Sequence, residues 1–233
     1  MANILMVVSA ADSLTMKDGS EHPTGFWAEE LVVAHQTLLD AGHTVHIATP
    51  GGRKPTVDQV SLAPDSAGGE ERAKGFRDYL AAIDAELSHP LVLADVEPSA
   101  YDAVVMPGGH GPMADLYKDA DLGRLLVAAD GDGKVIAPFC HGPAGLLSAA
   151  DDGGAFVFAG RRLTVFSNEE ELGGGTGENT PWLVESRLRE KGANVETGPD
   201  WASFVVRDGN LITGQNPQSS EDVAKEVIKA LAG

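Results

Sequence analysis

The stretch Lys134 to Ala150, KVIAPFCHGPAGLLSAA, contains the only cysteine of the chain, Cys140, followed directly by a histidine. The residues before Cys140 are mostly apolar and are bounded by glycine and charge, as in a short buried strand. Pro143 and the small and aliphatic residues after it favour the start of a helix. The sequence therefore predicts that Cys140 lies on a sharp strand-to-helix turn, a nucleophile elbow. Gly142 leaves room for the backbone there, and the amide N–H groups of the helix start favour negative charge.

Length and composition limit the classes of protein to consider. A chain of 233 residues with 42% hydrophobic residues can bury a sizeable core, and we expect one domain over residues 1–233. The formal net charge of −18 argues against a nucleic-acid partner, because such binding depends on basic patches. No apolar run approaches the roughly 18 residues of a membrane span, and the first residues lack the features of a secretory signal. We therefore expect a soluble, cytoplasmic protein with no membrane partner.

Apolar segments alternate with helical patterns in the first part of the chain. Strands are expected over residues 2–9, 43–50 and 101–106 and before Cys140, because their apolar positions follow one another or alternate. Between them, helical patterns cover residues 24–41, 70–87 and 119–130. The order β-α-β-α-β-α-β predicts an α/β fold with a doubly wound parallel sheet.

The rest of the chain carries clear boundary signals. We expect a strand over 162–166 and a helix over 180–191 with Thr180 as its N-cap. A small hairpin is expected between 204–207 and 210–213, joined across Asp208-Gly209, and a last helix over 219–231.

The helix expected over 24–41 has one broad apolar face, formed by Phe26, Trp27, Leu31, Ala34 and Leu38. Glu30 falls on this face, whereas Glu29 falls on the opposite flank and is expected to be solvated. A carboxylate on an apolar face is costly unless it is paired or protonated. Glu30 is therefore a candidate for a raised pKa and for proton transfer; the alternative is a position on the helix surface.

A glycine-rich turn, Pro107-Gly108-Gly109-His110-Gly111, follows the strand expected over 101–106. Parallel α/β folds build ligand sites at the carboxyl ends of their strands, and bare backbone amides there can hold an oxyanion. His110 either lines the resulting pocket or is a turn residue. The other histidines, including His22, are scattered without a metal-ligand spacing, so we expect no metal site.

Several motifs together carry a family resemblance: APFCHGP at 137–143, PGGHG at 107–111, TGFWAEEL at 24–31, FSNEEE at 166–171 and DGNLITGQNPQSS at 208–220. The chain resembles the ThiJ/PfpI branch of the class I glutamine amidotransferase-like superfamily. The likeness is closest to the subgroup of glutathione-independent glyoxalases (glyoxalase III) and heat-shock chaperones, and it extends over nearly the whole chain.

The resemblance implies a flavodoxin-like sandwich and a cysteine-centred site without metal, glutathione or nucleotide cofactor. By motif, Cys140 is the nucleophile, His141 is its neighbouring acid or base, and Glu30 is the carboxylate that touches the sulfur. The backbone N–H groups of Gly109 and His141 would form the oxyanion site, with His110 beside it.

A further carboxylate is implied after the strand expected over 162–166, where it would orient His141. Three glutamates, Glu169, Glu170 and Glu171, stand in a row there. Alignment without gaps from Gly160 favours Glu171, with Glu170 next.

The implied reaction is that of a lyase acting on a small α-oxoaldehyde. Cys140 would add to methylglyoxal or glyoxal, and proton transfer through an enediol followed by hydrolysis would give lactate or glycolate. Repair of glycated proteins or nucleotides would use the same residues. The alternatives are a holdase chaperone or redox sensor, whose cysteine oxidises, and a cysteine amidase or peptidase. The family commonly dimerises, so a homodimer with a role in the stress response is expected.

Overall fold

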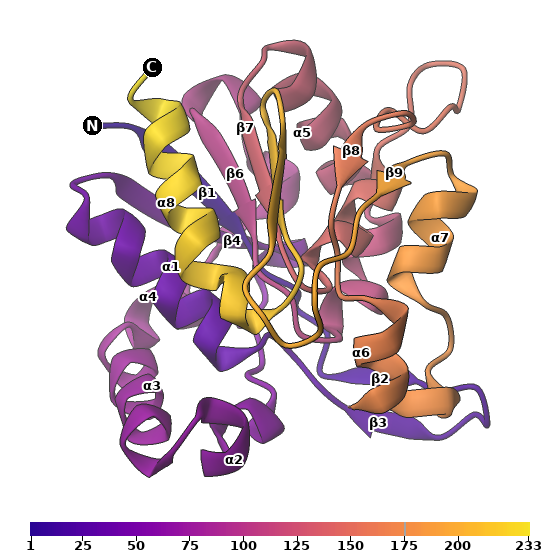
Figure 1. The fold of residues 1–233 in the computed structure, drawn as a ribbon. Helices are drawn as coiled ribbons and strands as arrows, with labels where there is room; N and C mark the ends of the chain where they lie inside the picture. The colour runs from indigo at the N-terminus through magenta and orange to yellow at the C-terminus, as the bar shows by residue number, and fades with distance from the viewer. Residues whose placement is uncertain (175) are drawn as a thin grey trace.

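The computed structural model describes residues 1–174 and 176–233. In this part of the chain the main sheet has seven strands in the order β10-β11-β7-β6-β1-β4-β5 (Figure 1). Its strands are β1 (Asn3–Val7), β4 (Thr44–Thr49), β5 (Leu91–Val92), β6 (Ala103–Met106), β7 (Val135–Pro138), β10 (Val205–Asp208) and β11 (Leu211–Gly214). All neighbouring pairs are parallel except the β10–β11 hairpin. The expected α/β doubly wound sheet is confirmed, and so is the C-terminal hairpin.

Two pairs of short strands lie outside the main sheet: β2 (Ser13–Thr15) with β3 (Glu21–Pro23), and β8 (Arg162–Leu163) with β9 (Asn194–Val195). The α-helices are α1 (Ala28–Asp40), α2 (Pro64–Ala67), α3 (Glu70–Ala82), α4 (Asp84–Ser88), α5 (Ala120–Gly131), α6 (Asn168–Gly173), α7 (Val184–Glu190) and α8 (Ser220–Leu231).

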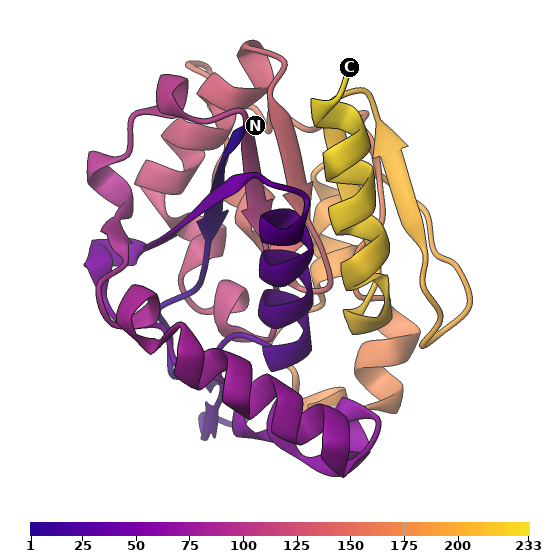
Figure 2. The same cartoon turned by 90° about the vertical axis from the view of Figure 1, so that its left-hand side faces the viewer.

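The central strands β1, β6 and β7 are apolar along their length because helices cover both faces of the sheet. One buried cluster joins strand side chains to α1, α3 and α8, and the other joins them to α5, α7 and the 3₁₀ segment 142–148. Figure 2 shows α1 and α8 side by side on one side of the strands and α5 on the other. Each fully buried leucine in these layers contributes about 1.5–3 kcal/mol.

The strand order reverses between β1 and β6, because β4 follows β1 on one side and β6 lies on the other. Crevices at such switch points, at the carboxyl ends of the strands, are where open α/β sheets bind ligands. The register places Met6 beside Val105, and Val105 beside Ala137. The segments that leave β1, β6 and β7 therefore meet at one edge of the sheet.

The expected first helix starts four residues too early. Residues 24–27 are not helical: the N–H of Phe26 donates to Thr56 O, and its C=O accepts from Asp58 N. The Thr24 hydroxyl donates to the Asp58 carboxylate and does not cap a helix. Glu29 is also not solvated, because it is buried and paired with Arg72 at 2.6 Å. Local pattern missed these contacts with residues 56–72, which are distant in sequence.

Four expectations for the later elements also need correction. The strand expected over 162–166 is only β8, because the following segment turns away to bond with Thr213 and Cys140. The helix after Cys140 is 3₁₀ over Gly142–Ser148, and α7 begins at Val184 and not at Thr180. β10 and β11 are joined across Gly209-Asn210, one residue later than expected.

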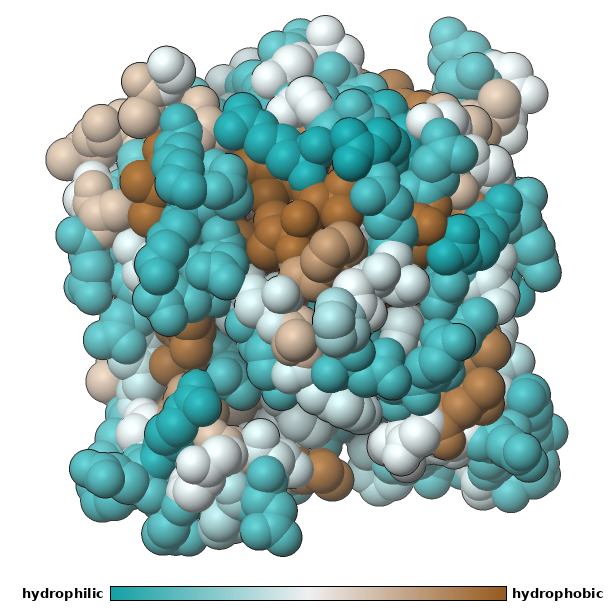
Figure 3. Space-filling view, in the orientation of Figure 1, coloured by the Kyte–Doolittle hydropathy of each residue, from teal (hydrophilic) through white to brown (hydrophobic). Residues whose placement is uncertain are grey.

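The molecular surface reflects the acidic composition. The face in Figure 3 is largely hydrophilic, with hydrophobic residues exposed in a few places. Leu39, Leu91 and Val92 are among the exposed large hydrophobic side chains, and Leu39 and Leu91 line one surface hollow beside β4. None of the helices in the described residues is both long and apolar enough to cross a bilayer.

Candidate active site

Cys140 lies on a strained turn directly after β7. Its φ is +56°, a left-handed conformation that costs a non-glycine residue about 1–3 kcal/mol. The turn is held on both sides, because Cys140 N donates to Gly214 O at 2.9 Å and Cys140 O accepts from Phe166 N at 2.9 Å. Gly142 is required for space: a Cβ there would lie 2.2 Å from Met106 O. The structure confirms the expected elbow, with its cysteine side chain almost wholly buried.

Glu30 approaches Cys140 from the first turn of α1 and is fully buried. Its Oε2 accepts a hydrogen bond of 2.6 Å from Gly108 N, and its Oε1 has no hydrogen-bond partner among the described residues. Burial raises the pKa of Glu30 to about 8, against the opposing effects of the adjacent Cys140 thiol and the Gly108 N–H. The carboxyl group is therefore mostly protonated at neutral pH, with the thiol as its neighbour.

His141 lies on the other side of the thiol. Its Nδ1 is 3.3 Å from Cys140 Sγ, and its Nε2 is 2.5 Å from Glu171 Oε2. An ionised carboxylate at Nε2 holds the proton on that nitrogen, which leaves the Nδ1 lone pair directed at the thiol. Burial lowers the pKa of His141, and neighbouring His110 lowers it further, while Glu171 opposes the shift. His141 is therefore a neutral imidazole that can accept the proton of the Cys140 thiol.

Glu171 accepts hydrogen bonds from several donors in a buried setting. His110 Nε2 lies 3.0 Å from its Oε1, and the hydroxyls of Thr176 and Thr180 donate to the same oxygen at 2.8 and 3.2 Å. Burial would raise the pKa of Glu171, but His141 and His110 outweigh that effect and hold the pKa well below its ordinary value. The carboxylate is thus ionised at neutral pH.

The three consecutive glutamates differ in their surroundings. Glu169 is exposed. Glu170 is fully buried and accepts from four donors away from His141: Ser167 N, Trp201 N, Gln215 Nε2 and Asn216 Nδ2. Glu171, which the ungapped alignment favours, is the one that reaches His141. Glu170 instead joins α6 to the loop that carries Trp201 and to the start of the last helical region.

Burial raises the pKa of the Cys140 thiol, and the charge and hydrogen bond of Glu30 raise it further, while the Gly109 N–H lowers it. Protonation of Glu30 removes its charge and turns it into a donor toward sulfur, so it favours the thiolate. The Gly109 N–H, one of the two expected oxyanion donors, therefore lies close to the Cys140 sulfur. His141 N makes no backbone hydrogen bond to the described residues. Glycine is required at 108, because a Cβ would lie 2.6 Å from His141 N.

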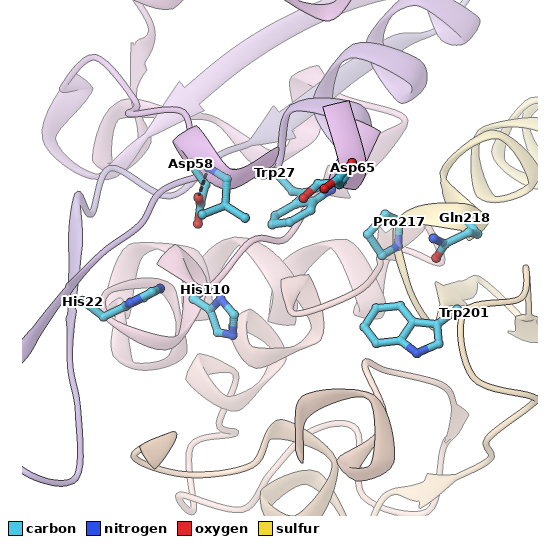
Figure 4. A pocket seen from close by; sticks show the side chains of 10 residues that line it. His22, Trp27, Asp58, Asp65, His110, Trp201, Pro217 and Gln218 are labelled. Atoms are coloured by element: carbon cyan, nitrogen blue, oxygen red, sulfur yellow. Dashed lines mark hydrogen bonds between the residues drawn. The ribbon is translucent and has the colours of Figure 1, made fainter. Parts of the chain in front are cut away.

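Two connected cavities lead to the thiol. The inner one has a volume of about 70 Å³ and is lined by Trp27, Gly109, His110, Cys140, His141, Phe166, Trp201 and Pro217. The outer one has a volume of about 410 Å³ and shares Trp27, His110, Trp201 and Pro217 with it. Figure 4 shows Trp201, Pro217 and Gln218 on one side of the outer cavity, opposite His22 and His110. His110 thus lines both cavities and also contacts Glu171. Four of the six residues expected at the site, Gly109, His110, Cys140 and His141, line the inner cavity, and the carboxyl groups of Glu30 and Glu171 lie behind Cys140 and His141.

Sequence reasoning missed several residues of the site. Thr176 and Thr180 donate to Glu171, and the Phe166 ring packs against the His141 ring with 4.5 Å between centroids. Two threonines in a loop carry no pattern that would have identified them. Asp65 and Ser66 also line the outer cavity.

Known proteins resemble this chain over nearly its whole length. The profile of the DJ-1/PfpI family matches residues 23–230. Glyoxalase 3 of Candida albicans is 26% identical over 236 residues, which cover 99% of this chain and 98% of that protein. Protein/nucleic acid deglycase HchA of Pseudomonas aeruginosa is 29% identical, covering 98% of this chain and 80% of its own length.

Solved structures extend the likeness to the fold. The crystal structure of glyoxalase III from Candida albicans superposes with a TM-score of 0.84 at 25% identity, covering 98% of this chain and 97% of the other. Rapid Encystment Protein 24 KDa of Francisella tularensis superposes with a TM-score of 0.88 at 30% identity, covering 99% of each chain.

Proposed function

Because the chain belongs to the DJ-1/PfpI family, we propose that it is a glutathione-independent glyoxalase that converts methylglyoxal or glyoxal to lactate or glycolate. One observation carries the proposal: the Cys140 thiol lies between Glu30 and His141 at an inner cavity of about 70 Å³. That space suits a two- or three-carbon aldehyde and excludes a peptide backbone with its side chains. The relatives named Glyoxalase 3 and glutathione-independent glyoxalase support the same reaction.

The first step forms a hemithioacetal. The Cys140 proton moves to His141 Nδ1, which is 3.3 Å from sulfur, and the thiolate adds to the aldehyde carbon. The N–H groups of Gly109 and His141 stabilise the oxyanion. Protonated Glu30 then gives its proton to that oxygen and becomes a carboxylate, as its pKa of about 8 allows.

The second step moves hydrogen between the two substrate carbons. The Glu30 carboxylate removes the proton from the carbon bound to sulfur, while the His141 imidazolium gives its proton to the ketone oxygen, which yields an enediol. Glu30 then returns its proton to the neighbouring carbon and takes the proton of the hydroxyl on the sulfur-bound carbon. This leaves a hydroxyl on the neighbouring carbon, a thioester on Cys140 and a neutral His141. His141, held by Glu171 at 2.5 Å, then assists a water molecule that cleaves the thioester. The products are the 2-hydroxy acid and the free thiol, so no external oxidant or reductant is needed.

Deglycation is the second candidate function. HchA, a relative that aligns with 98% of this chain, is named a protein and nucleic acid deglycase. The outer cavity of about 410 Å³ would accept the end of a modified side chain and present its aldehyde-derived group to Cys140. Release of adducts from pre-glycated peptide, with free methylglyoxal removed beforehand, tests this function. If the adducts are lost no faster than without the protein, deglycation is excluded and the free aldehyde remains the proposed substrate.

We also propose that the enzyme is a lyase of the hydro-lyase class, acts in the cytoplasm and forms a homodimer. A reducing compartment suits a chain whose single cysteine works as a thiol. Three exposed apolar side chains at and near edge strand β5 offer a contact surface for a second copy of the chain: Leu39, Leu91 and Val92. Sedimentation velocity of the wild type and Leu91→Glu checks the dimer, which the charge should weaken; a wild-type monomer contradicts it.

The central experiment is lactate formation from methylglyoxal by purified protein without added thiol. We expect turnover by the wild type and a loss of at least about 10³-fold in Cys140→Ser, because a hydroxyl is a far weaker nucleophile than a thiolate. His89→Ala, at an exposed histidine directly after α4, is the matched control and should retain full activity. A wild-type protein that makes no lactate would overturn the proposed function.

A further inference from the structure

Three potential metal ligands gather at the wall of the outer cavity. His22 lies in β3, Asp58 precedes the 3₁₀ segment Gln59–Leu62, and His110 belongs to the turn after β6. One ligand atom of each residue lies within 4.8 Å of one ligand atom of each of the others. Figure 4 shows His22 and His110 pointing toward one another, with Asp58 beside them. The proposed aldehyde chemistry uses neither His22 nor Asp58.

The contacts of His110 leave one ring nitrogen for an ion. Its Nε2 bonds to Glu171 Oε1 at 3.0 Å, so Nδ1 is the nitrogen with a free lone pair. Metal-binding histidines usually donate their other ring N–H to a carboxylate, which fixes the tautomer and makes the ligand more basic. Glu171 supplies that carboxylate here.

Asp58 is equally well held. It is 3% exposed; its Oδ2 accepts from the Thr24 hydroxyl at 3.0 Å, and its Oδ1 accepts from Val60 N at 2.9 Å. Each oxygen keeps a second lone pair, and the carboxylate faces the cavity. The site therefore has two buried ligands held in place before any ion arrives.

His22 is the adjustable third ligand. Its side chain is half-buried and makes no hydrogen bond to the described residues, and its ring meets that of His110 edge-on at 6.1 Å between centroids. Ligand atoms bound tetrahedrally to one Zn²⁺ at about 2.0–2.2 Å lie about 3.3–3.6 Å apart, whereas the three ligand atoms here lie within 4.8 Å of one another. His22, which no hydrogen bond to the described residues holds in place, is the ligand that moves to close the remaining distance.

We propose that His22, Asp58 and His110 form a binding site for a divalent transition-metal ion, of which Zn²⁺ fits the ligands best. Two imidazoles and one carboxylate are a common ligand set for Zn²⁺, and three protein ligands leave a coordination position open toward the cavity. The acidic chain attracts cations, and Asp65 lines the same cavity. Sequence reasoning missed the site because its members lie on three separate segments.

A second cluster, His110, His141 and Glu171, also has its ligand atoms within 4.8 Å. There the histidine Nε2 atoms already bond to Glu171 directly, at 3.0 and 2.5 Å. An ion at that position would have to displace both hydrogen bonds. The cluster of His22, Asp58 and His110 needs no such exchange, so we assign the ion to it.

The test measures binding of Zn²⁺ alone to chelator-treated protein by calorimetry, with Co²⁺ as a spectroscopic substitute. We expect one ion per chain and Co²⁺ bands without a sulfur-to-metal charge-transfer band. His22→Ala should weaken binding at least tenfold, and Asp58→Asn should do so while keeping an acceptor for Val60 N. Cys140→Ser and the surface control His89→Ala should bind as the wild type does, and circular dichroism checks that each variant is folded.

Three results would overturn the assignment: no Zn²⁺ binding by the wild type, unchanged affinity in His22→Ala and Asp58→Asn, or loss of binding in Cys140→Ser with a thiolate band in the wild type. Should His22→Ala fail to fold, His22→Gln provides the same comparison with a larger side chain. The measurement does not depend on aldehyde turnover. It therefore stands or falls separately from the proposed function.

Discussion

Glu30 and Glu171 are two buried carboxylates on opposite sides of the Cys140–His141 pair, and their pKa values shift in opposite directions. Glu30 receives one backbone N–H and faces a thiol, so burial prevails and its pKa rises to about 8. Glu171 receives two imidazole nitrogens and two hydroxyls, and its pKa falls. Burial alone therefore does not set the protonation of a carboxyl group; the number and charge of its donors decide it.

Because their pKa values shift in opposite directions, the two carboxyl groups can perform two tasks that a single carboxyl group could not. A group that gives and takes a proton near neutral pH must have a pKa near that pH, as Glu30 has. A group that holds a histidine in one tautomer must keep its charge throughout, as Glu171 does. The proposed mechanism depends on this division, and the following experiments test it.

Removal of proton transfer at Glu30 should have the largest effect. We expect Glu30→Gln to lower kcat/KM for methylglyoxal by about 10³-fold, because an amide can still fill the space but cannot exchange the proton. The neighbouring Glu29→Gln, which loses its pair with Arg72 and the smallest of the causes that shift the pKa of Glu30, is the matched control and should stay within about twofold of wild type. Equal losses in both variants would mean that the helix, and not the proton, was disturbed.

Glu171→Gln should have a smaller effect. We expect kcat to fall by about 10²-fold, because a neutral amide no longer stabilises an imidazolium at His141 or fixes its tautomer. The exposed Glu169→Gln is the control from the same acidic run. Steady-state kinetics and the rate of Cys140 alkylation provide the measurements; an alkylation rate unchanged in Glu171→Gln would contradict a role through His141.

The pH dependence of stability tests the raised pKa of Glu30 without any turnover. The pKa of Glu30 rises from 4.5 to about 8 on folding, so the folded chain holds this proton more tightly than the unfolded chain. Its contribution is fully present below pH 4.5 and is lost as the pH rises to about 8, by up to roughly 1.4 kcal/mol per pH unit.

Urea unfolding of the wild type and Glu30→Gln at pH 5 and pH 8 isolates this contribution. We expect the free energy of unfolding to fall less between these two pH values in the variant than in the wild type. Parallel falls in both proteins would show that Glu30 does not keep a raised pKa in the folded chain.

Those parts of the site that depend on neighbouring residues in the chain could be predicted from the sequence. Cys140 lies between a buried strand and Gly142, and Glu30 occupies an apolar helix face, so neighbours in the chain identify both. The doubly wound sheet follows from the order of the segments in the same way.

Contacts between distant segments could not be predicted. Thr180 looks like a helix cap in its local sequence, but its hydroxyl bonds to Glu171 Oε1 and Gly177 O. Thr24 similarly bonds to Asp58, and Glu29 pairs with Arg72. In each case the polar side chain has a long-range hydrogen-bond or ion-pair partner, whereas its local sequence suggests a different environment.

The two indoles at the pocket give the molecule a built-in optical reporter. Trp27 and Trp201 line both cavities, and the buried Trp27 Nε1 has no hydrogen-bond partner among the described residues. Trp182 packs instead against Tyr117 and Arg187. An aldehyde or an ion that enters the cavities changes the polarity around two of the three tryptophans. Emission from the unlabelled protein should therefore follow occupancy of the site in real time, with Trp182→Phe removing the constant background.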